Sequence, residues 1–206
     1  MITESNVKRI LIKDLNFDAL KIKKLDNFVK KLLVFNKKHN LISKNTEKQI
    51  WDRHILDSAQ LIRFIDVKRC TGIADLGSGG GFPGIILAIY FHNFNFHVKL
   101  YEKSPLKSVF LSNISNMLGL SCSIVCNDIN LVKIDSNYIV CRAFRKLSHI
   151  LNISRENCIK KHKIIIMKGR NAQQEINNTF MMKNYRYRLE NSITDKESKI
   201  IILNAE

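Results

Sequence analysis

Five of the chain's eight glycines lie within the eight positions from Gly77 to Gly84, after an apolar segment that ends at Leu76 and before another that begins at Ile85. Glycines crowded into a turn between a strand and a helix permit positive φ and let the backbone approach a ligand closely. The helix that follows offers unpaired backbone N–H groups to an anionic or polar group. This arrangement predicts a loop that binds a nucleotide cofactor.

Three kinds of cofactor compete for such a loop. No Gly-Lys-Ser/Thr follows the glycines, which excludes a Walker phosphate loop. A dinucleotide fingerprint is formally present from Gly79 to Gly84, but a single match of this kind is weak evidence. S-adenosylmethionine suits the segment better, because the D-x-G-x-G pattern of Asp75, Gly77 and Gly79 adds a carboxylate to the glycines. That carboxylate is suited to the methionine ammonium, directly or through water, and Pro83 is expected in the first turn of the helix.

Two further segments follow expected strands. Glu102 comes 27 residues after Asp75, at the end of the second strand, where an acid accepts hydrogen bonds from ribose hydroxyls. An exposed acid at a strand end explains Glu102 equally well by itself, but together with the loop the functional interpretation is favoured. The segment from Asn127 to Asn130 offers backbone and amide groups to an adenine edge, and a simple polar turn accounts for the same residues.

The fourth strand ends at Val140 to Phe144, where methyltransferases of this architecture often have their chemistry. The Pro-Pro-aromatic motif of amino-group methylation is missing. Cys141 lies where a nucleophile for carbon-5 methylation would be, but its apolar neighbour and the missing Pro-Cys context favour an inert thiol. Arg142 remains, suited to the cofactor's carboxylate or to substrate phosphate or base edges.

Guanine N7 is compatible with this set of residues. It carries an in-plane lone pair and no proton at neutral pH, so its methylation requires no general base. Alignment of N7 with the methyl group in a dry site is then sufficient for catalysis. The pattern permits N7 chemistry without proving it.

The elements that position these residues follow from the hydrophobic pattern. Residues 7–68 contain no glycine or proline, and their apolar residues recur at helical spacing, which predicts a helical first third. Later, short β-rich runs alternate with helical stretches, which is typical of a parallel sheet built from βαβ units. We expect strands near 72–76, 97–101, 122–126, 137–141, 162–167, 185–190 and 198–203, and helices near 83–91, 105–118, 146–157 and 171–180.

The predicted fold is therefore α/β and Rossmann-like, with a seven-stranded, mostly parallel sheet. The polar turn at 191–197 leaves no room for a crossover helix, so the last two strands are expected to form an antiparallel hairpin. We expect a helical N-terminal extension over residues 1–68 and a Rossmann-like methyltransferase domain over residues 69–206.

The charge favours a polyanionic partner. The chain carries a net charge of +16, and lysine and arginine neutralise phosphates. An AT-rich coding sequence, rich in Lys, Ile and Asn codons, would also produce such an excess. Residues 1–70 and 71–206 each carry +8, so the first third is about twice as positive per residue. Its lysines form either a solvated helix face or an RNA-facing surface: Lys21, Lys23, Lys24, Lys30, Lys31, Lys37 and Lys38.

Other features define what kind of protein to expect. No apolar run reaches the roughly 18 residues of a membrane span, and no secretory signal is present, which predicts a cytoplasmic protein that does not contact membranes. The five cysteines form no C-x-x-C pair, and the six histidines show no ligand spacing, so no metal is expected. Nothing requires more than a monomer.

Four segments, in this order, resemble the RsmG family, also called GidB, of bacterial 16S rRNA guanine-N7 methyltransferases. The segments are Asn40-Leu41-Ile42-Ser43 with Arg53-His54-Ile55-Leu56-Asp57-Ser58; the loop Asp75 to Gly84; Arg142-Ala143-Phe144; and Met167-Lys168-Gly169 with Glu175. The resemblance implies a methyltransferase that uses S-adenosylmethionine to modify N7 of a guanosine in the decoding-region loop of 16S rRNA, free or in the small ribosomal subunit or its precursor.

The resemblance also implies roles for matching residues. On spacing alone, Arg53 and Asp57 would form an exposed i,i+4 ion pair. The resemblance instead brings Arg53, His54 and Asp57 to the cofactor or RNA side of the sheet, and Lys168 is expected to hold phosphate rather than to face solvent. The predicted catalytic residues are Arg53, His54, Asp57, Arg142 and Lys168. The predicted cofactor residues are Asp75, Gly77, Gly79, Phe82, Glu102, Ile129, Asn130 and Arg142. Asn130 replaces the glutamate usual in the family.

Three other functions are kept as alternatives. One is a methyltransferase for another RNA or, less compatible with the basic first third, a small molecule. Another is a ribosome-associated binding protein with a vestigial cofactor site, against which the intact loop and Glu102 argue. The last is a dinucleotide-dependent oxidoreductase, which would bind a nicotinamide nucleotide instead of S-adenosylhomocysteine.

Overall fold

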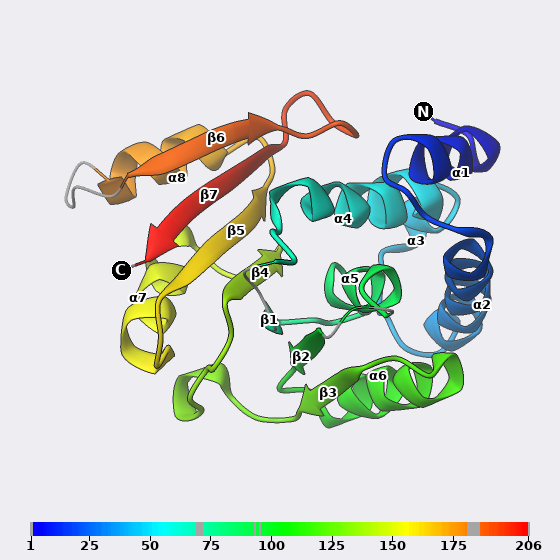
Figure 1. The fold of residues 1–206 in the computed structure, drawn as a ribbon, viewed down its shortest axis with the longest axis horizontal. Coiled ribbons are helices and arrows are strands. Elements are labelled where there is room, and N and C mark those ends of the chain that lie inside the picture. Colours follow the sequence, from blue (N-terminus) through cyan, green and yellow to red (C-terminus); the bar gives the residue numbers. More distant parts are fainter. Residues whose placement is uncertain (1, 69–71, 93, 95, 181–185, 206) are drawn as a thin grey trace.

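A central sheet organises the molecule in the computed structural model, which describes residues 2–68, 72–92, 94, 96–180 and 186–205 (Figure 1). Its strands are β1 Gly72–Leu76, β2 His97–Tyr101, β3 Cys122–Val125, β4 Tyr138–Arg142, β5 His162–Lys168, β6 Tyr187–Asn191 and β7 Lys199–Ala205. The strand order is β3-β2-β1-β4-β5-β7-β6. Strands β1 to β5 pair in parallel, and β7 runs antiparallel to both β5 and β6.

This topology confirms the predicted α/β fold and the antiparallel C-terminal hairpin. Strand β7 returns between β5 and β6, so the final hairpin is not simply added to the edge. Two expected boundaries lie outside the described residues: the start of the sixth strand at 185 and the start of the second domain at 69.

Helices cover both faces of the sheet. One face is covered by α1 Glu4–Lys13, α2 Ala19–Asn36, α5 Gly84–Tyr90 and α6 Pro105–Leu118, and by a segment that starts at Trp51. The other face is covered by η3 Ile129–Leu131, α7 Leu147–Asn157 and α8 Ala172–Phe180. Successive strand residues alternate between two hydrophobic clusters, as Val140 and Cys141 do in β4, because side chains on a strand point to opposite faces.

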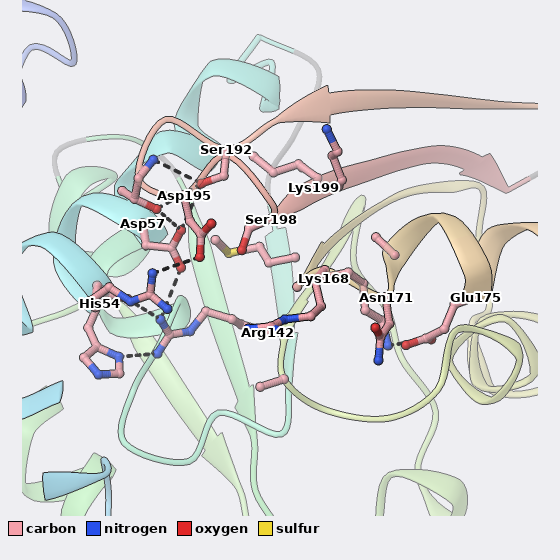
Figure 2. Close-up of a pocket in the computed structure, with 18 of the residues that line it drawn as sticks. His54, Asp57, Arg142, Lys168, Asn171, Glu175, Ser192, Asp195, Ser198 and Lys199 are labelled. Atoms are coloured by element: carbon pink, nitrogen blue, oxygen red, sulfur yellow. Dashed lines mark hydrogen bonds and ion pairs between the residues drawn. The ribbon is translucent and has the colours of Figure 1, made fainter. Parts of the chain in front are cut away.

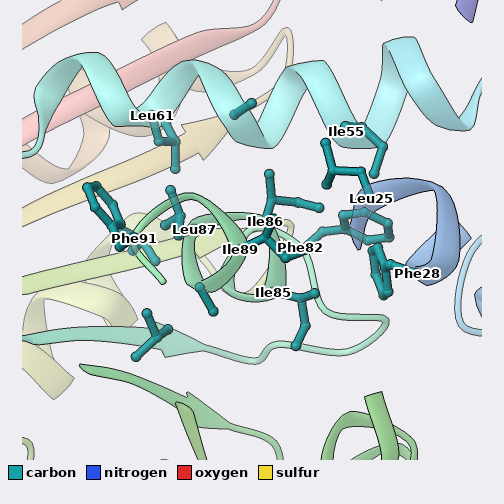
Figure 3. Packing of buried hydrophobic residues seen from close by; sticks show 14 of the residues in the cluster. Leu25, Phe28, Ile55, Leu61, Phe82, Ile85, Ile86, Leu87, Ile89 and Phe91 are labelled. Carbon is teal, nitrogen blue, oxygen red and sulfur yellow. The ribbon is translucent and has the colours of Figure 1, made fainter. Parts of the chain in front are cut away.

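The segment from Trp51 to Phe64 is one helical rod whose geometry changes along its length. It passes from a π-helix, η1 Trp51–Leu56, through α4 Asp57–Ala59 to a 3-10 helix, η2 Gln60–Phe64. The short helix α3 Lys44–Glu47 precedes it. Single π-helical turns occur frequently at functional sites. Buried Ile55 and Leu61 point from this rod toward α5, where Ile86 and Leu87 lie (Figure 3).

The N-terminal helices share the core of the sheet. One cluster of buried side chains runs from Val7 in α1 through Phe28 in α2 to Ile200 in β7. The rings of Phe28 and Phe82 lie 5.4 Å apart, which joins α2 directly to the glycine loop (Figure 3). The helices before β1 thus pack against the same core as the sheet, and the division into an extension over 1–68 and a domain over 69–206 stays a prediction. Their role as an RNA-facing extension stays a prediction.

Candidate active site

The glycine loop connects β1 to α5 at the carboxyl edge of the parallel strands. Gly77, Gly79 and Gly81 have φ values of +71°, +54° and +96°, which side chains rarely adopt. A Cβ at Gly77 would collide with the ring of Phe144. Helix α5 begins at Gly84, so Pro83 is the residue before the first turn instead of a member of it, and the Phe82–Pro83 peptide bond is cis.

The buried side chain of Asp75 binds the backbone of this loop. Its side chain is fully buried, and Oδ2 accepts a hydrogen bond of 3.0 Å from the backbone N–H of Gly84. Oδ1 has no partner among the described residues, and burial raises the pKa of Asp75 to about 7. The carboxyl group does not line the cavity above the loop. Its expected contact with the methionine ammonium stays a prediction, for which Oδ1 is the available atom.

A cavity of about 710 Å³ opens above the loop. Six predicted cofactor residues line it: Gly77, Gly79, Phe82, Glu102, Ile129 and Arg142. Glu102 is nearly buried and accepts hydrogen bonds from the backbone N–H groups of Gly79 and Ser104 at 2.9 and 2.8 Å, one on each carboxylate oxygen. Each oxygen keeps a lone pair for a hydroxyl. The glycine loop, where a Cβ would fill the space, fits the methionine part of S-adenosylmethionine. The fixed carboxylate of Glu102 fits its ribose.

Asn130 lies outside this cavity. Its backbone N–H and Nδ2 donate to Asp128 Oδ1 at 3.0 and 2.8 Å, and its carbonyl accepts from Asn157 Nδ2. The other residues of this segment line the cavity: Asn127, Asp128 and Ile129, the last of which is buried. The amide of Asn130 therefore orients the turn, and an adenine contact through its backbone stays a prediction.

A second cavity, of about 590 Å³, adjoins the first. It lies between the ends of β4, β5 and β7 and the rod that carries Arg53 and Asp57 (Figure 2). All five predicted catalytic residues line it, although they come from three distant parts of the chain. His54, Arg142 and Ala143 line both cavities, so they form the junction between them.

Arg142 is the centre of that junction. Its Nη1 donates to the carbonyl of Arg53 at 2.9 Å and to Asp57 Oδ2 at 3.3 Å, and its Nη2 donates to His54 Nδ1 at 2.6 Å. The guanidinium carbon lies 5.1 Å from the centre of the Phe82 ring. The rod and β4 are thereby joined across the sheet edge, and the guanidinium is fixed in one orientation (Figure 2).

His54 is held as a neutral acceptor. Its Nδ1 faces a guanidinium, which only donates, so the ring proton lies on Nε2 and is donated to Thr46 Oγ1 at 2.8 Å. Burial lowers the pKa of His54 to about 3, and the charges of Arg142 and Arg53 add to this. The ring also packs on Phe82, with centroids 4.9 Å apart. His54 thus has a partner on each ring nitrogen.

Asp57 and Arg53 do not pair with one another. Asp57 Oδ1 accepts from Gln60, Ser192 and Thr194 at 2.9, 3.3 and 2.7 Å. Arg53 Nη1 instead binds Asp195 Oδ2 at 2.9 Å, and this contact holds the pKa of Asp195 below its usual value. The exposed i,i+4 ion pair is therefore not formed. The two residues attach the loop between β6 and β7 to the rod.

Lys168 lies in the second cavity with its ammonium engaged. Nζ donates to the carbonyl of Arg145 at 2.6 Å and pairs with Glu175 at 2.9 Å, and its side chain is 11% exposed. These contacts use two of the three ammonium hydrogens, and the expected phosphate role stays a prediction.

Several residues of the site were not singled out from the sequence. Gln60 is fully buried, accepts from the backbone N–H of Ile193 at 3.0 Å, and donates to Asp57 and Ser192. Asn36 holds the turn at Leu41, whose carbonyl lies against Gly80. A buried amide in a helix is a weak sequence signal, and Ser192 and Thr194 carry none at all. Glu175 lies within the resembling segments, which was the available clue.

The interpretation of Cys141 as a nucleophile is weakened by its environment. Cys141 is fully buried, and burial raises the pKa of its thiol to about 12, which agrees with an inert thiol and not with a nucleophile. Among the described residues, the His, Cys, Asp and Glu side chains form no group of three that could hold a metal ion. No described helix is long and apolar enough to cross a membrane.

Comparisons with known proteins show which family this chain resembles. A family model described as rRNA small subunit methyltransferase G (GidB) matches residues 21–200. The ribosomal RNA small subunit methyltransferase G of Rickettsia felis is 39% identical over 184 residues, covering 87% of this chain and 91% of that protein. The protein of the same name from Pelagibacter ubique is 37% identical over 196 residues, covering 93% and 92%.

Solved structures agree at the level of the fold. A SAM-dependent methyltransferase from Aquifex aeolicus superposes with a TM-score of 0.59 at 11% identity, covering 85% of this chain and 97% of that one. TYW2 of M. jannaschii, solved in complex with AdoMet, gives a TM-score of 0.52 at 14% identity, covering 75% and 76%.

The sheet order, the glycine loop and the carboxylate at the end of β2 define a Rossmann-like methyltransferase of the S-adenosylmethionine-dependent class. The family match covers most of the chain, and the relatives align over nearly their whole length. The chain belongs to the GidB family of rRNA small subunit methyltransferases.

Proposed function

We propose that this protein transfers a methyl group from S-adenosylmethionine to N7 of a guanosine in the decoding-region loop of 16S rRNA. The observation that supports N7 is the chemistry of the junction between the cavities. Of the residues that line both cavities, His54 alone is a possible base; it is neutral, and each ring nitrogen has a partner. An exocyclic amino group would lose a proton on methylation. Guanine N7 needs no proton acceptor.

Bound S-adenosylmethionine supplies an electrophilic methyl group on a sulfonium centre. Gly77 and Gly79 would leave room for its methionine part, Glu102 would accept hydrogen bonds from the ribose hydroxyls, and Ile129 would contact the adenine. Arg142 is fixed by Asp57, His54 and the Arg53 carbonyl, so it orients groups at the junction without reorganisation. Catalysis then consists of alignment and exclusion of water.

The RNA is proposed to approach over a positive rim. Helix α2 points its C-terminal end at the site, because Asn36 binds the turn at Leu41 beside the glycine loop. Its other end lies beside Tyr90, at the far end of α5, where the ammonium of Lys21 is 5.2 Å from the ring centre. Lysines near the C-terminal end of α2 are therefore better placed for RNA. Basic residues also line the cavities: Lys103, Lys107, Arg145, Arg170 and Lys199.

The test is methyl transfer to small ribosomal subunits from a bacterium lacking this protein. Labelled S-adenosylmethionine is supplied, and the product nucleoside is identified by mass spectrometry. We expect 7-methylguanosine in 16S rRNA. We also propose that the protein acts as a monomer in the cytoplasm. Label in another nucleoside would refute N7 chemistry, label in another RNA would refute the substrate, and binding of S-adenosylhomocysteine without transfer would favour a ribosome-associated binding protein.

A further inference from the structure

The second cavity contains three carboxylates among its lining residues: Asp57, Asp195 and Glu175. Asp57 accepts four hydrogen bonds, three on Oδ1 and one on Oδ2. Asp195 holds a donor on each oxygen, Glu197 N–H on Oδ1 and Arg53 on Oδ2. Glu175 differs, because both of its donors bind Oε2. Within the described part of the chain, its Oε1 accepts nothing.

Glu175 is held through one carboxylate oxygen, Oε2, while Oε1 has no donor among the described residues. Oε2 accepts from the backbone N–H of Leu147, at the start of α7, at 2.8 Å and pairs with Lys168 at 2.9 Å. Lys168 uses two of its three ammonium hydrogens, one for Glu175 and one for the Arg145 carbonyl. The pair therefore retains one free donor beside one free acceptor. Lys168, at 11% exposed, is much more buried than Arg53 at 42%, while Glu175 and Asp195 are alike at 29% and 27%.

The register of β4 and β5 fixes where the Lys168–Glu175 pair lies relative to the junction between the cavities. Met167 pairs with Arg142 in the register of β5 and β4, so Lys168 lies one residue further on, level with Ala143. Ala143 lines both cavities. In Figure 2, Glu175 lies on the opposite side of Arg142 from His54 and faces Lys168 across a short ion pair.

Guanine matches an adjacent donor and acceptor of this kind. Its O6 accepts, its N1–H donates, and the two are neighbours on the ring. O6 also lies next to N7, so a base with N7 at the junction directs O6 and then N1–H away from it. Adenine offers the reverse pattern, a donor at position 6 and an acceptor at N1.

We propose that Lys168 and Glu175 form the subsite that recognises the guanine base: Lys168 donates to O6, and Glu175 Oε1 accepts from N1–H. This inference rests on the proposed function, since it takes guanine N7 as the reacting atom. It assigns Lys168 to the base instead of to a phosphate. A site built to bond polar base atoms rejects analogues that leave its buried groups unpaired.

The experiment compares wild-type protein with Glu175→Gln and Glu190→Gln. Glu190 is the matched control, an ion-paired glutamate in β6 that does not line the cavities. We expect kcat/KM for 7-methylguanosine formation to fall about 10- to 100-fold in Glu175→Gln. It should stay within about 3-fold in Glu190→Gln, which removes a carboxylate outside both cavities. The Kd for S-adenosylhomocysteine, which reports folding, should stay within about 2-fold in both variants.

A second arm uses only the wild-type protein, so it does not depend on how the variants fold. Reconstituted subunits carry inosine or 2-aminopurine at the methylated position. Inosine keeps O6 and N1–H and should react within about 10-fold of guanosine, whereas 2-aminopurine loses both and should react at least about 100-fold more slowly.

The two proposals fail in different ways. Absence of 7-methylguanosine with the wild-type protein would refute the proposed function before any variant is considered. If the wild type forms it, near-normal activity of Glu175→Gln, a large loss in Glu190→Gln, or efficient reaction of 2-aminopurine would each overturn the base-recognition subsite.

Discussion

His54 allows a sharp test of the electrostatics at the junction. The pKa of His54 is about 3 in the folded protein, while the ordinary value is 6.5. At pH 8 the residue is neutral in both states. As the pH falls below 6.5 the unfolded chain takes up a proton that the folded protein refuses, so stability is lost. Between pH 8 and pH 5 this amounts to about 2 kcal/mol, at about 1.4 kcal/mol per pKa unit.

Asp75 acts in the opposite direction. Its pKa is raised from 3.8 to about 7, so its contribution to stability is present at low pH and is lost as the pH rises through 7. The two effects are of similar size between pH 5 and pH 8. The pH dependence of the wild-type protein therefore conceals both, and a variant is required to separate them.

His54→Asn is that variant, because its Oδ1 can still accept from Arg142 while it cannot titrate. Its free energy of unfolding should rise by about 2 kcal/mol relative to wild type on going from pH 8 to pH 5. Urea unfolding is followed through Trp51, the single tryptophan, which is buried in the same rod. Equal shifts in both proteins, or a His54 NMR titration with a pKa above 5, would refute the reasoning.

Three further changes probe other parts of the site. Gly77→Ala should weaken S-adenosylhomocysteine binding at least about 10-fold by calorimetry, because Gly77 has a positive φ and a Cβ there would meet the Phe144 ring. The control is Gly119→Ala, also at positive φ but in open space, which should cost about 1 kcal/mol of stability and leave binding unchanged. Gln60→Ala should cost about 2–3 kcal/mol in urea unfolding and speed amide exchange at Ile193, which loses its acceptor; unchanged exchange would contradict this. Arg142→Ala should reduce methyl transfer about 100-fold with unchanged circular dichroism, and full activity would remove Arg142 from the site.

The sequence predicted the parts of the molecule that local patterns determine. The glycine loop, the strands and the helices after β1 follow from alternation, glycine clustering and turn residues within windows of about ten residues. The boundaries of β1 and β2 agree with the expectation residue for residue. The collection of Arg53, His54, Asp57, Arg142 and Lys168 in one cavity was expected from resemblance, since spacing alone favoured an exposed ion pair.

The side-chain partners were not predictable in the same way. Arg53 binds Asp195 and Asp57 binds Arg142, partners that lie 142 and 85 residues away. Spacing along a regular helix says nothing about such contacts, and the change from π to 3-10 geometry within residues 51–64 has no sequence signature. The engaged ammonium of Lys168 is another result of tertiary structure, because its partners come from the segment after β4 and from α8.

The return of β7 between β5 and β6 has a consequence for the protein's own synthesis. A chain leaves the ribosome N-terminal end first, so the cofactor loop and its carboxylates are available for folding well before residues 192–205. Until those residues emerge, Asp57 and Arg53 lack the partners of the β6–β7 loop, and β6 has no neighbour to join it to β5. A nascent chain can therefore contain every residue that lines the first cavity while one wall of the second cavity is still missing. We expect the two cavities to be completed in this order during translation.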